Sequence, residues 1–410
     1  MDLFTLFLFQ GLAAFSGQLL NFALIWQILN WYHSPLLMSV CVGVGIVLTI
    51  LTTPWIGQKV DRSHRLKVAA TGNALSVAGS LGFFVCLPLL HGQRSGIAVI
   101  VPFYALRALA TQIQLTATMA ALADMGTDAT RGQLFARWQT ISSVSQIAAV
   151  PLSAALMTVL HLDVFVLIDI IAVSTAVINA WRLTRRVPMH AVEPVEAGAR
   201  RSAFRDLKST WSYLREDAVL ATLLLAIPFL NFVGSPIGAL FPALVKIDWH
   251  LSVRSLAIAE TLSSIGILIS SVLQSMWTPK VQRERLIVVS LFAVTVALGM
   301  MAGWQGASPY LLYSGMLVCG FSIMLVNIPL QTAIATCTPE SMRGRVDSML
   351  TVLSNASAPF GLLLFGAMAE WTGTRAVMWL AAALYAVMIV VLAIRFAGAG
   401  RRAPIENSTT

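Results

Sequence analysis

Long runs of apolar residues constrain this chain more than any other feature. No charged residue occurs between Leu36 and Ile56, and none occurs between Val68 and Leu90. At helical rise, about 20 residues span the hydrocarbon core of a bilayer. Lipid offers no partner to a free backbone N–H or C=O group, so each run is expected to cross the membrane as a helix. The composition, 57% hydrophobic and 11% charged, excludes a soluble globular domain.

Twelve such segments can be placed along the chain, and they predict an all-α membrane protein. They cover residues 3–30, 36–56, 68–90, 97–123, 133–159, 162–184, 218–246, 253–277, 286–304, 309–337, 347–370 and 376–396. The first run is too long for the apolar part of a cleavable signal, so we expect it to be retained as a helix. The four cysteines, Cys41, Cys86, Cys319 and Cys337, fall in apolar runs, which predicts core residues and not a disulfide framework.

The basic residues predict the orientation in the membrane. If the N-terminus is cytoplasmic, most of the 27 Lys and Arg residues fall in inner loops and tails. The exceptions are Arg94, Lys246, Arg254 and Arg375 on the outer side, and Arg107 within a span. The positive-inside rule therefore predicts an integral protein of the plasma (inner) membrane with both termini in the cytoplasm.

The longest polar segment divides the chain into two sets of six spans. The expected parts are an N-terminal half (1–184), a cytoplasmic linker (185–217), a C-terminal half (218–396) and a cytoplasmic tail (397–410). In the linker, Leu207, Trp211 and Leu214 share one helical face, which indicates a short helix on the membrane surface. A flexible linker with chance periodicity is the alternative interpretation.

An internal repeat supports the two halves. Arg131-Gly132 precedes the fifth span and Arg343-Gly344 precedes the eleventh. The sequence Lys59-Val60-Asp61-Arg62 is also partly repeated as Lys280-Val281-Gln282-Arg283, which lacks the acid. The two six-helix halves are therefore expected to be related structures.

A short charged stretch, residues 57–67, joins the second and third spans. Its six ionisable side chains are Lys59, Asp61, Arg62, His64, Arg65 and Lys67. We expect a tight turn that this density of cations holds on the cytoplasmic side. Arg65 is expected to reach Asp124 at the inner end of the fourth span, which would tie the turn to its own half.

Three charged residues, Arg107, Asp169 and Glu260, fall inside predicted spans, where each is costly unless paired or hydrated. A carboxylate in a low-dielectric environment can load and release a proton, so Glu260 and Asp169 are candidate proton-coupling residues. For Glu260 the alternative is a helix-end glutamate that reaches external water. For Asp169 the alternative, which we favour, is hydrogen bonding between spans. Arg107 is interpreted as a cation that binds anionic groups or lowers the pKa of a nearby acid, and the alternative is a structural arginine bonded to backbone carbonyls.

Neutral amides also occur in several spans. Gln18 and Asn21 are three apart in the first span and share a helix face. Asn327 and Gln331 are four apart in the tenth span, and Asn231 lies in the seventh. A mostly apolar cavity with a few amides suits a large amphipathic ligand. Hydrogen bonds between helices, with no ligand, are the alternative.

Taken together, these residues resemble the macrolide-efflux type of major facilitator transporter, a group close to the siderophore exporters. The matching motifs are Gly57-Gln58-Lys59-Val60-Asp61-Arg62, Leu106-Arg107-Ala108, Leu167-Ile168-Asp169, Ala259-Glu260 and Gly344-Arg345-Val346. The sequence departs from the family at His64, where a glycine is usual. The resemblance implies the major facilitator fold, with twelve transmembrane helices in two six-helix halves.

The resemblance also implies roles for particular residues. Spans one, four, seven and ten line the central cavity in this family, which makes the substrate-cavity residues Gln18, Asn21, Arg107, Asn231, Asn327 and Gln331. The same likeness places Asp61 beside the start of the eleventh span. The implied cytoplasmic gate comprises Gly57, Asp61, Arg62, Arg65, Asp124, Arg343, Gly344 and Arg345.

The implied function is export of an amphipathic small molecule, drug-like or macrolide-like, driven by inward proton flow with no other cofactor. Export of a siderophore or another endogenous metabolite is the alternative, and import of a small nutrient is a third. An enzyme would need acids and histidines clustered at one membrane depth, whereas the six histidines lie at or near span ends. A channel or a non-transporting receptor is equally disfavoured. We expect a monomer in the lipid bilayer, with no metal and no nucleic-acid partner.

Overall fold

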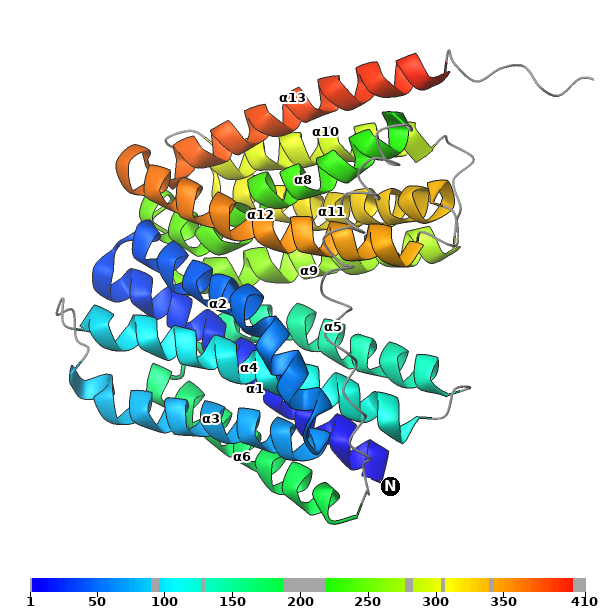
Figure 1. Ribbon diagram of the computed structural model, residues 1–410. Coiled ribbons are helices and arrows are strands. Elements are labelled where there is room, and N and C mark those ends of the chain that lie inside the picture. Colours follow the sequence, from blue (N-terminus) through cyan, green and yellow to red (C-terminus); the bar gives the residue numbers. More distant parts are fainter. Residues whose placement is uncertain are drawn as a thin grey trace, which may run out of the picture. The chain divides into compact units, whose positions relative to one another are not determined.

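The computed structural model describes residues 2–89, 96–126, 130–186, 218–276, 283–303, 307–338 and 343–400. These residues form twelve α-helices and no strand (Figure 1). The first six are α1 (Asp2–Tyr32), α2 (Pro35–Asp61), α3 (Arg65–Cys86), α4 (Ile97–Met125), α5 (Arg131–Leu156) and α6 (Leu162–Thr184). The others are α8 (Ala218–Ala243), α9 (Val253–Met276), α10 (Arg283–Ala302), α11 (Pro309–Cys337), α12 (Arg343–Thr372) and α13 (Thr374–Gly400). The predicted all-α fold is confirmed.

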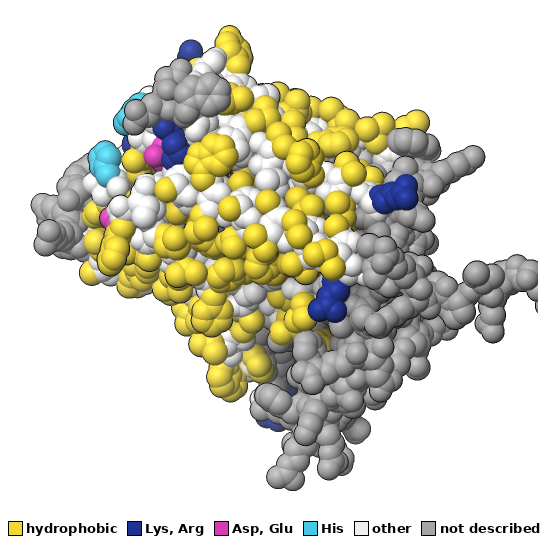
Figure 2. Space-filling model, turned by 90° about the horizontal axis from the view of Figure 1, so that it is seen from above, with side chains coloured by type: hydrophobic (Ala, Val, Ile, Leu, Met, Phe, Trp, Pro, Cys, Tyr) yellow, Lys and Arg dark blue, Asp and Glu magenta, His cyan; other side chains and the backbone are white. Residues whose placement is uncertain are grey.

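Most of these helices have the composition of membrane spans. Among the described residues, ten helical segments are long and apolar enough to cross a bilayer. On the face drawn in Figure 2, the described surface is largely apolar between its ends. The helices α5 and α12 are equally long but more polar. Ser142, Ser143, Ser145 and Gln146 lie in α5, and Arg345, Asp347 and Glu370 lie in α12.

The charged stretch after the second span is more helical than the sequence predicts. The expected tight turn between the second and third spans is present, but it is shorter than residues 57–67, because α2 continues through Asp61 and only residues 62–64 separate it from α3. The physical reason is packing: Val60 is 1% exposed and extends the buried face of Ile56 against α3 and α4. Because the residues beyond Gly57 add buried apolar contacts, the helix continues past this glycine.

The first helix of each half ends in the same unusual way. His33 follows α1 and His250 follows the π-helical turn η3 (Leu244–Asp248) beyond α8, and both have φ of 52°. Left-handed backbone at a helix end satisfies the last carbonyl groups and reverses the chain. Ser34 and Pro35 then start α2, with the Ser34 Oγ accepting a hydrogen bond from the Leu37 N–H at 3.1 Å.

The chain divides into two compact units, which we describe separately. Unit 1 comprises Met1–Val195 and Ala239–Ile258, and unit 2 comprises Glu196–Gly238 and Ala259–Thr410. Residues 239–258 therefore pack with the first six helices; for example, Lys246 Nζ lies 5.2 Å from the centre of the Trp26 ring. The functional division at the 185–217 linker remains a prediction, and the expected surface helix lies outside the described residues.

Within unit 1, α1 packs against α5 and α6, and α3 packs against α4 and α6. A Cβ on Gly72 would lie 2.8 Å from the Gln114 backbone nitrogen, so only glycine allows this approach of α3 to α4. Within unit 2, α10 packs against α11 and α13, and α12 packs against α13. The backbones of α9 and α11 also meet closely, since a Cβ on Gly266 would lie 2.7 Å from the Phe321 nitrogen.

Candidate functional site

A buried ion pair joins two helices in the interior of unit 1. Arg107 Nη1 of α4 donates to Asp169 Oδ2 of α6 at 2.6 Å, and Nη2 faces Oδ1 at 3.4 Å. The Asp169 side chain is fully buried and that of Arg107 is 13% exposed. Both residues lie well inside candidate membrane spans. The sequence identified each charge separately but did not predict that they form a pair.

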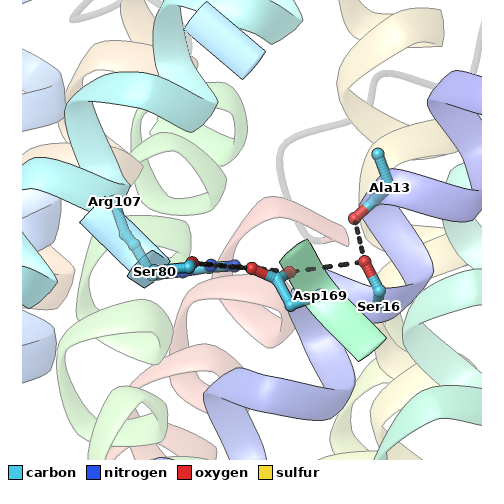
Figure 3. A network of polar contacts seen from close by, with 5 residues as sticks. All are labelled: Ala13, Ser16, Ser80, Arg107 and Asp169. Atoms are coloured by element: carbon cyan, nitrogen blue, oxygen red, sulfur yellow. Dashed lines mark hydrogen bonds and ion pairs between the residues drawn. The ribbon is translucent and has the colours of Figure 1, made fainter. Parts of the chain in front are cut away.

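Two serines from two further helices complete the network. The Ser80 hydroxyl of α3 donates to Asp169 Oδ2 at 2.9 Å and accepts from Arg107 Nη1 at 3.1 Å. The Ser16 hydroxyl of α1 lies 3.3 Å from Asp169 Oδ1 and 3.1 Å from the Ala13 carbonyl. Figure 3 shows Arg107 and Ser80 on one side of the carboxylate and Ser16 on the other. The network therefore fastens α1, α3, α4 and α6 together at one point.

The guanidinium is also held sterically. A Cβ on Gly17 would lie 3.1 Å from Arg107 Nη2, so the glycine leaves room for the ion pair beside α1. On its own helix, Arg107 lies 5.8 Å from the centre of the Phe103 ring, which stacks on Phe83 with centroids 4.3 Å apart. A charge without a partner at this depth would be expensive, so each member of the pair explains the presence of the other.

A second polar layer lies two helical turns closer to the N-terminus of α1. Gln10 Oε1 accepts hydrogen bonds from Asn73 Nδ2 at 3.2 Å and from Gln114 Nε2 at 2.8 Å. Asn73 precedes Ser80 by seven residues on α3, and Gln114 follows Arg107 by seven on α4, about 10 Å along each helix. Gln10 is 1% exposed, and its Nε2 has no partner among the described residues. The interior of unit 1 thus carries two stacked polar layers.

The third intramembrane charge, Glu260, is in a different setting. It lies in α9 of unit 2, within a candidate span, and is half-buried. Among the described residues, no ion pair and no hydrogen bond of its carboxylate is formed. Of the two acids expected to bind protons, Glu260 therefore lacks the compensating partners that surround Asp169.

The amides expected in a substrate cavity occupy several environments. Asn231 and Asn327 each donate to the carbonyl four residues earlier in their own helix, Ile227 and Ile323, at 2.9 Å. Gln18 and Asn21 are half-buried in α1. Gln331 lies in α11, but its side chain is outside what the structure describes. These residues belong to different units, so their grouping around one ligand remains a prediction.

Part of the expected cytoplasmic gate forms within unit 1. Arg65 Nη1 contacts Asp124 Oδ1 and donates to the Ala120 carbonyl at 2.8 Å, which ties the start of α3 to the end of α4. Asp61 and Arg62 are exposed, and a Cβ on Gly57 would meet nothing within 4 Å. Arg343, Gly344 and Arg345 begin α12 in unit 2, with side chains outside the described set. The role of these residues as a gate stays a prediction.

Sequence reasoning missed the serines and the unit 1 amides. Ser16 and Ser80 are ordinary residues for a packed membrane helix, and nothing local marks them. The sequence did contain an indication of the ion pair, because two opposite charges within the membrane spans of one half each need a partner. The seven-residue spacing from Asn73 to Ser80 and from Arg107 to Gln114 was a further sign that polar residues recur on one face.

The sequence profile of the Major Facilitator Superfamily matches residues 6–346, and a second match covers residues 229–409. The chain belongs to this superfamily of membrane transporters. Within it, relatives that match most of the chain are macrolide efflux proteins. Macrolide efflux protein A of Streptococcus pyogenes is 24% identical over 400 residues, covering 92% of this chain and 91% of that protein. Macrolide efflux protein A of Enterococcus faecalis is 25% identical over 334 residues, covering 75% and 94%.

Solved structures support the fold. A bacterial homologue of the iron transporter ferroportin, in an inward-facing state, aligns with a TM-score of 0.77 at 15% identity and covers 96% of this chain and 98% of its own. The nucleoside transporter NupG aligns with a TM-score of 0.71 at 13% identity, covering 96% and 99%. Identities this low establish the shared fold and carry no information on the substrate.

Proposed function

We propose that this protein exports an amphipathic small molecule from the cytoplasm by proton antiport with alternating access. It would act as a monomer in the plasma (inner) membrane, with both termini cytoplasmic, and would need no cofactor besides the proton gradient. It is proposed to be neither an enzyme nor a binder of nucleic acid. The observation that carries the proposal is the similarity to two macrolide efflux proteins, which covers 92% and 75% of this chain.

The distribution of the buried charges supports proton coupling through Glu260. Antiport needs an acid that can be protonated in one state and deprotonated in another. Asp169 is engaged by Arg107, Ser80 and Ser16, and protonation would break several of these contacts. Glu260 can change its protonation state without that loss. Arg107 then acts by holding Asp169 and the four helices around it, and not as a substrate ligand.

The proposal is tested by accumulation and proton-release measurements. In an efflux-deficient bacterial host, cells that express the protein should accumulate less radiolabelled erythromycin than cells with an empty vector. A protonophore should abolish the difference, because the driving force is the proton gradient. In inverted vesicles, adding erythromycin should release protons from the lumen of energised vesicles. Equal accumulation with and without the protein would contradict macrolide export.

Export of a siderophore or another endogenous metabolite is the alternative. Its test is the release of iron-chelating activity from cells that carry or lack the gene. Protein-dependent release together with unchanged erythromycin accumulation would favour the alternative, and the proton-release assay would then be repeated with the released compound.

A further inference from the structure

The outward face of α6 has the character of a lipid contact along its whole length. Leu167, Ile171 and Ile178 are 42%, 64% and 68% exposed, and all lie on the side of the helix that α1 and α3 leave uncovered. The opposite side carries Asp169 and other buried residues. An uncovered apolar stripe on a membrane span is expected to face acyl chains.

At the end of this stripe the surface is hollowed. Val177, Ile178, Trp181, Arg182 and Arg185 line a groove of about 350 Å³ at the C-terminal end of α6. Trp181 is 51% exposed, and tryptophan is enriched at the depth of lipid headgroups. The groove therefore joins an apolar floor to a basic rim. The charge distribution of the chain predicts that this end of α6 is cytoplasmic.

The two arginines of the rim have no acidic partner among the described residues, and both are exposed. The neighbouring arginine differs, because Arg186 lies 3.8 Å from Asp2 of α1. Two guanidinium groups without an acidic partner among the described residues lie one turn apart beside an apolar groove, which suits the charge of a phosphate that carries acyl chains.

We propose that this groove binds an anionic phospholipid. Arg182 and Arg185 hold the headgroup phosphate, Trp181 lies at the headgroup boundary, and an acyl chain runs along Ile178 and Ile171. The charge complementarity and the continuity with the lipid-facing stripe together select a lipid as the occupant. Juxtamembrane arginines on a cytoplasmic surface attract anionic lipids in this way.

The test is binding of phosphatidylglycerol to the full-length protein in detergent, measured by native mass spectrometry, with phosphatidylcholine as the neutral lipid. The wild type should bind phosphatidylglycerol at least about ten-fold more tightly. The variant Arg182→Gln/Arg185→Gln should lose about thirty-fold in affinity, equivalent to about 2 kcal/mol for two arginines. Unchanged affinity in this variant would overturn the proposal.

Arg395 supplies a matched control. It is an exposed arginine near the end of α13, beside Ile394, which is 66% exposed, and it does not line the groove. Arg395→Gln should bind phosphatidylglycerol as the wild type does, whereas an equal loss would show nonspecific charge attraction and overturn the site. Because both positions are exposed, we expect the variants to fold. The variant Arg182→Lys/Arg185→Lys keeps the charge for insertion and should still lose several-fold in lipid affinity, because lysine lacks the planar fork. Full affinity in both the glutamine and lysine variants would refute a role of these arginines.

A competition measurement separates a lipid from a free anion. Glycerol phosphate has the same phosphate chemistry without acyl chains, so at equal concentration it should not displace phosphatidylglycerol. Displacement would show an anion site without lipid character and would overturn the proposal. None of these measurements involves transport, so the lipid site stands or fails separately from the proposed export function.

Discussion

The two units share a helical plan but stabilise their interiors differently. In unit 1, several buried polar side chains bond between helices, as Arg107, Asp169 and Ser80 do. In unit 2, the described hydroxyls and amides mostly bond to carbonyls of their own helix; Ser290, Thr295 and Asn327 are examples. Exceptions are Gln274, which donates to the Met324 carbonyl, and Tyr385, whose hydroxyl donates to the Leu230 carbonyl.

Close backbone packing joins the helices of unit 2, as it also does at Gly72 in unit 1. Gly266 and Gly320 let α9 and α11 approach, and Gly361 of α12 lies against Phe232 of α8. Small residues at helix contacts are a common source of stability in membranes. Among the described residues, unit 1 therefore has more polar bonds between its buried helices, whereas the Glu260 carboxylate of unit 2 has no ion-pair partner.

The contrast between the two units should be clearest at Asp169. We expect Asp169→Asn to leave Arg107 buried without a counter-charge and to destabilise the protein by about 3–5 kcal/mol. The measurement is unfolding in detergent followed by tryptophan fluorescence. The double variant Asp169→Asn/Arg107→Gln removes both charges and should recover more than half of the loss. If the double variant is as unstable as Asp169→Asn, the uncompensated charge is not the cause.

Glu260 should show the opposite behaviour. Because no described residue pairs with its carboxylate, Glu260→Gln should change the unfolding free energy by less than about 1 kcal/mol. Under the proposed function, it should abolish uphill erythromycin export in vesicles and leave downhill exchange intact. Gradient-driven export at the wild-type rate would remove Glu260 from the coupling mechanism, and a large loss of stability would end the contrast with Asp169.

The amide layers give a finer test of the same contrast. Gln114→Leu removes an interhelical donor to Gln10 and should cost about 1–2 kcal/mol. Asn327→Leu replaces an amide whose hydrogen bond among the described residues stays within its own helix, so its cost should stay within about 0.5 kcal/mol. The two variants change similar side chains to the same residue, and fluorescence-detected unfolding compares them. Equal costs would show that the interhelical bonds of unit 1 add nothing.

The fold was largely predictable because one physical rule dominates it. Lipid requires continuous helices, so apolar runs gave the bounds of α6 and α11 as the structure has them. The end of α2 was missed because the buried side chain of Val60 extends the helix beyond the apolar run. The Arg107–Asp169 pair could not be predicted, for a different reason. The two residues lie on different helices, and a single sequence does not state which faces of distant spans meet.

The smallest effect is expected at the cytoplasmic turn, where two acids near one arginine-rich stretch can be compared. Asp124 contacts Arg65 inside unit 1, so Asp124→Asn should lower stability slightly, by about 1 kcal/mol or less for a partly exposed pair. Asp61 is exposed, and its proposed partner is the N-terminus of α12, where the helix dipole favours an anion. If that contact forms in only one state of the transport cycle, Asp61→Asn should leave stability unchanged.

Asp61→Asn should then shift the balance between transport states by about fivefold, as expected for one partly hydrated contact. Export should fall, and a cysteine placed at Gly57 should be labelled faster by a membrane-impermeant thiol reagent from the cytoplasmic side, in a background where the four native cysteines are replaced. The native Gly57 has open space around it, so this reporter should not disturb the turn. Removing an acid does not weaken a positive-inside signal, so insertion should be unaffected. Unchanged labelling and unchanged export would contradict the gate hypothesis, and the charged turn would then act only as a determinant of topology.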